Sequence, residues 1–313
     1  MTGHREVVVT RSGSLTTVQD AGRAGLAHLA IPPSGALDRP AWRLANRLVG
    51  NAEEAAALET TLTGVGLRAC VSVVAAVTGA RAPVTVDGRA EGWGVPIPVA
   101  PGQEMDVGLA VVGLRSYVAL SGGITVGMVL GSRASDSLSG LGPPPLQPGC
   151  RLPLGPVPGP VPAVDFAPYP LPPDRLRLVL HPGPRWDWLS EDGVRALANA
   201  MWRVSSDSNR IGLRLDGPAV GRRASRGELA SEGMVTGAVQ VTASGQPIIF
   251  LADHPTTGGY PVVGVVDAPG VTACSQARPG TPVAFRLDDV AGSGAGWARP
   301  PEGPDASGER DEP

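Results

Sequence analysis

The stretch that decides the fold is residues 228–261, ELASEGMVTGAVQVTASGQPIIFLADHPTTGGYP. Two apolar segments, residues 238–241 and 247–252, are separated by a short Ala-Ser-Gly turn, which is typical of a β-hairpin. The second segment runs into Asp253 and His254, and then into the neighbouring glycines Gly258 and Gly259. Neighbouring glycines let the backbone approach a ligand or another strand closely. The stretch therefore predicts paired strands that end in a polar loop, either a plain connection or a ligand contact.

The composition around this stretch favours a β-rich fold. The chain has 313 residues, enough for one large or two ordinary domains, and its hydrophobic content of 42% can bury a sizeable core. Glycine (43 residues) and proline (33) are abundant, and both interrupt helices and mark turns between strands. The net charge is −3, with seven acids and two arginines from residue 288 onward. The rest of the chain is close to neutral, which argues against a nucleic-acid-binding surface.

Several kinds of chemistry are excluded by residue type. All 26 basic residues are Arg, so a Schiff-base lysine and a P-loop lysine are absent. Any phosphate or carboxylate must be held by Arg, backbone N–H groups or a metal. The four histidines never occur at metal-ligand spacing, so we expect no metal site. The three cysteines are too scattered for a disulfide framework, and we expect small core residues: Cys70, Cys150 and Cys274.

The N-terminal part predicts short strands around one helix. The helix begins after Asp38, whose carboxylate suits an N-cap, and it ends at Gly50. The apolar stripe of this helix comprises Ala41, Leu44, Ala45, Leu48 and Val49. The predicted strands are residues 6–10, 55–61, 68–77, 84–86, 104–108 and 116–120.

The C-terminal part repeats that pattern. A strand at residues 176–180 precedes a helix from about Ser190, whose apolar face we expect to include Val194, Leu197, Ala198 and Met201, and further strands follow through residue 287. We therefore predict a mainly β protein with a few helices and two β-barrel domains. The predicted boundaries are residues 1–154 for the first barrel, 155–173 for a Pro-rich linker, 174–287 for the second barrel and 288–313 for a disordered acidic tail. The longest apolar run, residues 71–77, is too short to span a bilayer, and without a signal peptide we expect a cytoplasmic protein.

Polar side chains in the loops are the candidates for a ligand site. They are Gln19, Asp20, Arg23, Ser34, Asp38, Arg133, Arg210, Arg214, Gln240, Asp253 and His254. Taken singly, each is more typical of a turn, a cap or a surface ion pair, and Asp20 and Arg23 are suitably placed to pair with each other. Together, beside the glycine pairs, they favour an anionic ligand held by Arg side chains and backbone N–H groups.

A series of motifs in a fixed order resembles the biotin-dependent carboxyltransferase family. This family includes the C subunit of bacterial 5-oxoprolinase, the Kip antagonist and proteins labelled allophanate hydrolase subunit 2. The motifs are Thr16-Thr17-Val18-Gln19-Asp20-x-Gly22-Arg23-x-Gly25, Pro33-Ser34-Gly35-Ala36-x-Asp38, Ala57-Leu58-Glu59-x-Thr61, Gly131-Ser132-Arg133, Gly212-Leu213-Arg214-Leu215-x-Gly217-Pro218, Gly237-Ala238-Val239-Gln240-Val241 and Thr256-Thr257-Gly258-Gly259-Tyr260-Pro261. The resemblance covers about residues 6–287. It departs in two places: Pro255 replaces the family's usual Gln, and Ala30-Ile31-Pro32 stands where a glycine is more usual.

The resemblance implies two cyclophilin-like β-barrels and a partner of the B-subunit or Kip-inhibitor type. It implies the C subunit of an ATP-dependent 5-oxoprolinase, which acts with the A and B subunits to convert 5-oxoproline to glutamate. Asp253 is then the expected base, and Arg133, Arg210 or Arg214 is an expected phosphate contact, with further ligand contacts at Thr256, Thr257 and Tyr260. The departures remove His254 from the expected catalysts.

Two alternatives stay open. A carboxyltransferase of a urea-type carboxylase would aim backbone donors, at Gly258-Gly259 or Gly122-Gly123, at the ureido oxygen of biotin. That biotin would have to arrive on another protein, because this chain has no lysine to carry it. A Kip-antagonist-like regulator would have no chemistry of its own.

Overall fold

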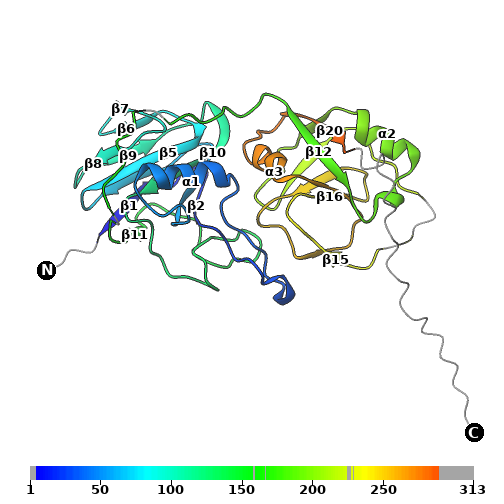
Figure 1. Ribbon diagram of the computed structural model, residues 1–313, viewed down its shortest axis with the longest axis horizontal. Helices are drawn as coiled ribbons and strands as arrows, with labels where there is room; N and C mark the ends of the chain where they lie inside the picture. The colour runs from blue at the N-terminus through cyan, green and yellow to red at the C-terminus, as the bar shows by residue number, and fades with distance from the viewer. Residues whose placement is uncertain (1–4, 158, 166, 224–226, 228, 289–313) are drawn as a thin grey trace, which may run out of the picture.

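The strands of the molecule form two lobes that lie side by side (Figure 1). The computed structural model describes residues 5–157, 159–165, 167–223, 227 and 229–288, and within these ranges the protein is mainly β with three α-helices. The prediction of a mainly β fold with a few helices is thereby confirmed.

The N-terminal lobe encloses its core between two sheets. The six-stranded sheet has the order β11 (Arg151–Pro153), β1 (Glu6–Arg11), β4 (Gly66–Ala69), β9 (Glu104–Val107), β6 (Val84–Val86) and β7 (Arg89–Glu91). The five-stranded sheet has the order β2 (Leu15–Gln19), β3 (Ala57–Thr61), β10 (Val112–Leu120), β5 (Val73–Arg81) and β8 (Ile97–Val99). Side chains alternate between the faces of a strand. On β10, Val118 and Leu120 therefore enter the core between the sheets, whereas Tyr117 and Ala119 face the opposite side.

That opposite face of the five-stranded sheet is covered by helix α1 (Arg39–Leu48). The Asp38 carboxylate accepts a hydrogen bond from the N–H of Ala41 at 3.0 Å, as expected for an N-cap. Trp42 is fully buried in the same cluster as Tyr117. The five-stranded sheet is thus buried on both faces, and the polar side chains of β2 and β3 are buried with it, including Thr17, Gln19 and Glu59.

The C-terminal lobe is a closed barrel of seven strands. Around the barrel they run β12 (Leu176–Pro182), β19 (Val262–Val266), β16 (Ala238–Val241), β17 (Pro247–Phe250), β14 (Gly212–Asp216), β13 (Trp202–Val204) and β20 (Pro282–Leu287). The hairpin predicted from the opening stretch is β16 and β17, with Val239 opposite Ile249. Parallel pairing of β12 with β20 closes the ring.

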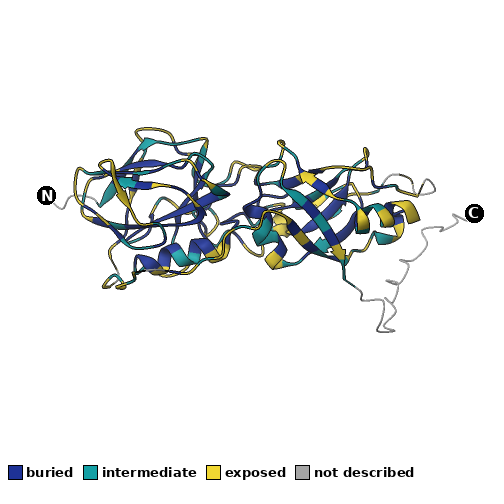
Figure 2. Ribbon diagram, turned by 90° about the horizontal axis from the view of Figure 1, so that it is seen from above, coloured by how far each residue is buried: buried dark blue, intermediate teal, exposed yellow. Residues whose placement is uncertain are grey.

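Short elements decorate both lobes. They are the 3-10 turns η1 (Ala27–Leu29) and η2 (Trp186–Trp188), the helices α2 (Glu191–Asn199) and α3 (Ala268–Ser275), and a ribbon of β15 (Glu232–Gly233) with β18 (Thr257–Gly258). Figure 2 shows buried strands inside both lobes, with exposed residues on loops and on the outer sides of helices.

Some expectations need correction. The strand predicted at residues 68–77 is two strands, β4 and β5, which belong to different sheets. Met201 lies beyond the end of α2 and is 44% exposed, so it is not part of a buried helical face. Cys274 is buried, but Cys70 is exposed and Cys150 half-buried. Helix α3 was not anticipated at all.

The Pro-rich segment lies against the N-terminal lobe in its described parts. The Tyr169 hydroxyl donates to the Asp38 carboxylate at 2.6 Å, and Ala167 is buried beside α1. Of the acidic tail predicted from residue 288, only Asp288 falls within the described residues, and it contacts His181 at 2.8 Å. No helix in the described ranges is both long and apolar enough to cross a membrane.

Candidate functional site

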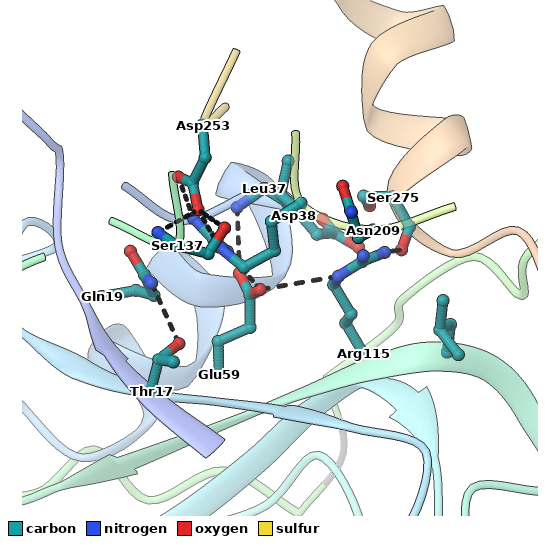
Figure 3. Close-up of polar contacts among 12 residues, drawn as sticks. Thr17, Gln19, Leu37, Asp38, Glu59, Arg115, Ser137, Asn209, Asp253 and Ser275 are labelled. Carbon is teal, nitrogen blue, oxygen red and sulfur yellow. Dashed lines mark hydrogen bonds and ion pairs between the residues drawn. The ribbon is translucent and has the colours of Figure 1, made fainter. Parts of the chain in front are cut away.

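Asp253, the carboxylate expected to act as a base, lies at the junction of the two lobes with no exposed surface. It accepts hydrogen bonds from the Ser34 hydroxyl (2.7 Å), from the Ser137 N–H and hydroxyl (3.0 and 2.7 Å), and from Nε and Nη2 of Arg210 (2.9 and 3.0 Å). Figure 3 shows Asp253 above Ser137 in this network. Both carboxylate oxygens are therefore fully engaged by protein donors.

Arg210 carries the network from the barrel into the N-terminal lobe. The amide oxygen of Asn209 accepts from the N–H of Ile211 at 2.8 Å, a local turn that orients Arg210 inward. Besides Asp253, the guanidinium donates to Glu59 and to the carbonyl of Gly35 (2.8 Å). The guanidinium is 2% exposed and has no open side toward solvent.

Glu59, on β3, is the centre of charge on the N-terminal side. It accepts from the Tyr117 hydroxyl at 2.7 Å and from the N–H of Leu37 at 3.1 Å. Its other oxygen binds Arg210 and lies 3.5 Å from Nε of Arg115 on β10. Two carboxylates and two guanidinium groups thus alternate across the junction, which compensates charges that would be unfavourable if buried singly.

The pKa of Asp253 reflects this pairing. Burial alone would raise the pKa, but the charge of Arg210 and the hydrogen bonds from Arg210 and Ser137 bring it below the ordinary value of 3.8. Asp253 is therefore an anion in the folded protein. Its hydrogen bonds suit a structural link between the lobes better than a proton acceptor.

The sequence suggests that Asp20 and Arg23 pair with each other. In the structure, each side chain instead forms hydrogen bonds with the loop at residues 126–134. Asp20 accepts from the N–H of Gly22 (2.8 Å), the Ser132 hydroxyl (2.6 Å) and the N–H of Arg133 (2.6 Å). Arg23 donates through Nε to the carbonyl of Val129 (3.1 Å) and through Nη2 to that of Ala134. The N–H groups of Gly22 and Arg133 are thus satisfied by the protein's own carboxylate.

Gln19 and Ser34 complete this loop cluster. The Gln19 amide donates to the Ser135 carbonyl at 3.0 Å, and the Ser34 hydroxyl, which donates to Asp253, also lies 3.0 Å from that carbonyl oxygen. Within the described residues, buried polar atoms without a partner gather here: Gln19 Oε1, Arg23 Nη1, Ser135 Oγ and Asp136 Oδ2. Unpaired buried polar atoms need an explanation, and these are available to a ligand or to ordered water.

The Thr-Thr-Gly-Gly-Tyr loop forms the β15–β18 ribbon. Thr257 and Gly258 pair with Gly233 and Glu232. The Gln240 amide supports the ribbon from the barrel wall by donating to the Tyr260 carbonyl at 2.8 Å. Gly259 and Tyr260 are exposed at its edge.

A pocket of about 210 Å³ lies between this ribbon and the loop that carries η1. Its lining is mostly apolar, with Arg23, His254 and Thr256 as the polar contributors, and the remaining residues are Gly25, Leu26, Ala27, Ile31, Pro33, Met234, Val235 and Thr236. Ala27 and Val235 are exposed, so the pocket opens to solvent. Apolar pockets with a few convergent polar groups are the usual form of small-molecule sites.

The expected phosphate contacts do not converge. Arg210 is committed to the lobe junction, Arg133 donates to the carbonyl of Val126 at 2.8 Å, and Arg214 projects from the exposed side of β14. The Gly122 and Gly123 N–H groups are also engaged, by Asn51 and by the carbonyl of Leu120. No set of three or more His, Cys, Asp or Glu side chains gathers in the described part of the chain.

Sequence reasoning missed Glu59, Arg115 and Ser137 as partners in the junction. A charged residue inside a predicted strand, here Glu59 in ALETT, is a signal of a buried, paired charge. Ser137 carries no comparable signal, because its role arises from a contact across 116 residues.

Comparisons with known proteins agree on one family. A family model described as "Carboxyltransferase domain, subdomain A and B" matches residues 29–287. The C subunit of the 5-oxoprolinase of Escherichia coli (strain K12) is 37% identical over 280 residues, which is 88% of this chain and 89% of that protein.

Solved structures share the fold. TTHA0988 superposes with a TM-score of 0.83 and 35% identity over 91% of this chain and 56% of its own. The K. lactis urea amidolyase superposes with a TM-score of 0.83 and 30% identity over 90% of this chain and 18% of its own. The chain thus spans little more than half of the first of these proteins and less than a fifth of the second.

Proposed function

The chain belongs to the family of carboxyltransferase domains with subdomains A and B, and on that premise we propose that it is the C subunit of a multi-subunit, ATP-dependent 5-oxoprolinase. In this role it acts with the A and B subunits to hydrolyse 5-oxoproline to glutamate. The observation that carries the proposal is the match to the C subunit of the E. coli enzyme, which extends over 88% of this chain and 89% of that protein.

The pocket beside η1 supports a small cyclic substrate. Its apolar lining, including Leu26, Ile31 and Met234, suits the methylene groups of a small ring, and its polar lining residues are Arg23, His254 and Thr256. At about 210 Å³ it exceeds several-fold the roughly 30 Å³ that one water occupies in the liquid.

ATP does not fit the residues expected to hold it. Phosphate recognition needs cations whose donors converge on one point. Arg133 instead donates to a carbonyl group, Arg210 joins the two lobes, and Arg214 projects from the barrel. We therefore assign nucleotide binding to one of the partner proteins and derive no step through ATP in this chain.

The partners in this proposal are the A subunit of the enzyme and a Kip-inhibitor-like protein as its B subunit, in the cytoplasm. The isolated chain is then expected to lack 5-oxoprolinase activity, because the activation of the lactam lies outside it.

A second candidate is the carboxyltransferase part of a biotin-dependent urea-type carboxylase. The observation that favours it is the superposition on the K. lactis urea amidolyase over 90% of this chain. In that case biotin arrives on another protein, since this chain contains no lysine.

Reconstitution separates the candidates. The chain is mixed with its A and B partners, ATP and 5-oxoproline, and glutamate is measured with and without the chain. Equal glutamate formation when the chain is omitted would refute the role as the C subunit. Parallel assays with a biotinylated carrier and urea test the second candidate. A Kip-antagonist-like regulator would instead prevent the B-type partner from inhibiting a kinase, and the chain would show no turnover in either assay.

A further inference from the structure

Among the described residues, nothing donates a hydrogen bond to one ring nitrogen of His254, a histidine in the pocket beside η1. His254 lines this pocket and is 3% exposed. Its Nδ1 lies 2.7 Å from the carbonyl oxygen of Pro255. A carbonyl oxygen can only accept a hydrogen bond, so Nδ1 must carry the proton. In neutral imidazole the other nitrogen, Nε2, then has a lone pair, and no described residue donates to it.

We propose that His254, through Nε2, is the proton-transferring residue of this pocket, and that the pocket takes a small cyclic amide. This inference rests on the proposed function for the identity of the amide. The role expected of Asp253 thus falls to the next residue, because both oxygens of Asp253 are engaged by Ser34, Ser137 and Arg210.

The imidazole is fixed in place by its neighbours. The Pro255 carbonyl holds Nδ1, and the ring of Phe250 lies 6.2 Å away, centroid to centroid, at an angle of 50°. Phe250 ends β17, and residues 251–254 follow it directly, so the ring is positioned by the barrel. A proton-transfer group held by a rigid element keeps its orientation toward the substrate.

Burial keeps His254 neutral at pH 7. Burial lowers its pKa below 6.5, and the bond to the Pro255 carbonyl and the charges of Asp253 and Asp136 offset only part of that effect. Arg23 contributes a positive charge to the same pocket lining. A neutral imidazole is the form that can accept a proton.

The proton balance of ring opening is simple. As the oxygen of water bonds to the ring carbonyl carbon, one proton of that water moves to Nε2. When the bond between the carbonyl carbon and the ring nitrogen breaks, the proton moves from Nε2 to that nitrogen. Water has then been added across the amide bond, and the imidazole is neutral again.

The first test measures the tautomer in the full chain by itself. Nitrogen-15 NMR at pH 7 is expected to show a protonated Nδ1 and an unprotonated Nε2 for His254, with the Nε2 signal shifting when 5-oxoproline is added. A protonated Nε2 at pH 7 would overturn the inference whether or not the proposed function holds, and an unshifted Nε2 signal would overturn the assignment of 5-oxoproline to this pocket.

The second test uses the reconstituted complex. His254→Gln preserves a polar group near the Nε2 position but cannot transfer a proton. We expect kcat to fall by about 100-fold or more, with KM changing much less. Wild-type kcat/KM should fall as the pH drops through the pKa of His254, below its ordinary value of 6.5, and this limb should vanish in His254→Gln. Added imidazole should restore part of the rate.

His28→Asn is the matched control, because His28 is exposed on η1 and does not line the pocket. It should retain the wild-type rate and pH profile. If His254→Gln keeps the acid limb, or loses no rate, His254 is not the proton-transferring residue. If the wild-type complex forms no glutamate, the proposed function fails, and the NMR result decides on His254.

Discussion

At the scale of single residues, the main finding is that Asp253 holds the lobes together. Its neighbours in the network come from the N-terminal lobe (Ser34 and Ser137) and from the barrel (Arg210). An ionised carboxylate with this many donors is stabilised as the anion. Removal of the Asp253 carboxylate should therefore lower the stability of the fold more directly than it affects catalysis.

We predict that Asp253→Asn lowers the free energy of unfolding by roughly 3 kcal/mol at pH 7, because it leaves Arg210 buried with one of its two carboxylates lost. Urea denaturation of the full chain measures the difference. Asp216→Asn, which alters an exposed residue on β14, should change the stability by less than about 0.5 kcal/mol. Similar losses in the two variants would contradict the assigned role.

The pH dependence of this effect has a definite sign. The pKa of Asp253 is lower in the folded protein than its ordinary value of 3.8. Its contribution to stability is therefore complete above that ordinary value and disappears as the pH falls through the folded pKa. The difference between wild type and Asp253→Asn should shrink in acid, as measured by denaturation at a series of pH values.

At the scale of elements, the β15–β18 ribbon depends on a glycine. A Cβ added to Gly258 would lie 2.7 Å from Nε2 of Gln240 and 3.0 Å from Cε of Met234. Both distances are too short for unstrained contact. The glycine therefore allows the ribbon to lie directly on the barrel wall, where it borders the pocket.

Gly258→Ala should displace Gln240 from the Tyr260 carbonyl and destabilise the ribbon by about 1–3 kcal/mol. Hydrogen exchange of the Met234 amide, which donates to Thr256 at 2.8 Å, reports the loosening. Gly233→Ala is the matched control on the partner strand, since nothing lies within 4 Å of its added Cβ. Unchanged hydrogen exchange in Gly258→Ala would show that the side chains of Gln240 and Met234 move to accommodate the added methyl group.

Local signals explain which elements were predictable. Helix α1 follows from the Asp38 cap and an amphipathic stripe, and the β16–β17 hairpin from two apolar runs and a short turn. Helix α3 has no clear apolar stripe, so its start signal, Asp267 accepting from the N–H of Gly270 at 2.9 Å, went unnoticed. The sequence also gives no local signal for the break between β4 and β5. Apolar residues continue across the break, and only the pairing of the two strands in different sheets separates β4 from β5.

The candidate site was predictable in part. The sequence points to the correct loops, since Arg23, Ser34, Asp253 and Thr256 all lie at the lobe junction or in the pocket beside it. The sequence does not show that both carboxylate oxygens of Asp253 accept hydrogen bonds from the protein. Those bonds depend on Arg210 and Ser137, which come from distant segments. Long-range contacts of this kind have no signature in local composition.

At the scale of the whole molecule, the lobes are coupled by the charges that alternate between Glu59, Arg210 and Asp253. Gln276 adds a neutral link, with its amide donating to Asp38 at 2.7 Å and accepting from the N–H of Arg115 at 3.0 Å. We expect the described lobes to unfold together as one cooperative unit.

Arg210→Met should uncouple them, because it strands two buried carboxylates, at a loss of about 3–5 kcal/mol. Scanning calorimetry is expected to show one transition for the wild type and two for the variant. Arg68→Met removes an exposed pair with Glu104 and should keep a single transition. One sharp transition in Arg210→Met would mean that apolar contacts, not charges, couple the lobes.

The shared charge network also bears on how the chain is made. Arg210 is synthesised 151 residues after Glu59, which takes roughly 8–30 s at ribosomal rates of about 5–20 residues per second. Arg115, on the neighbouring strand β10, is synthesised 56 residues after Glu59 and then provides a cationic partner until Arg210 is made. Arg115 therefore serves as a temporary counter-ion for the nascent N-terminal lobe, and replacing it should expose that half-made protein to chaperones and proteases.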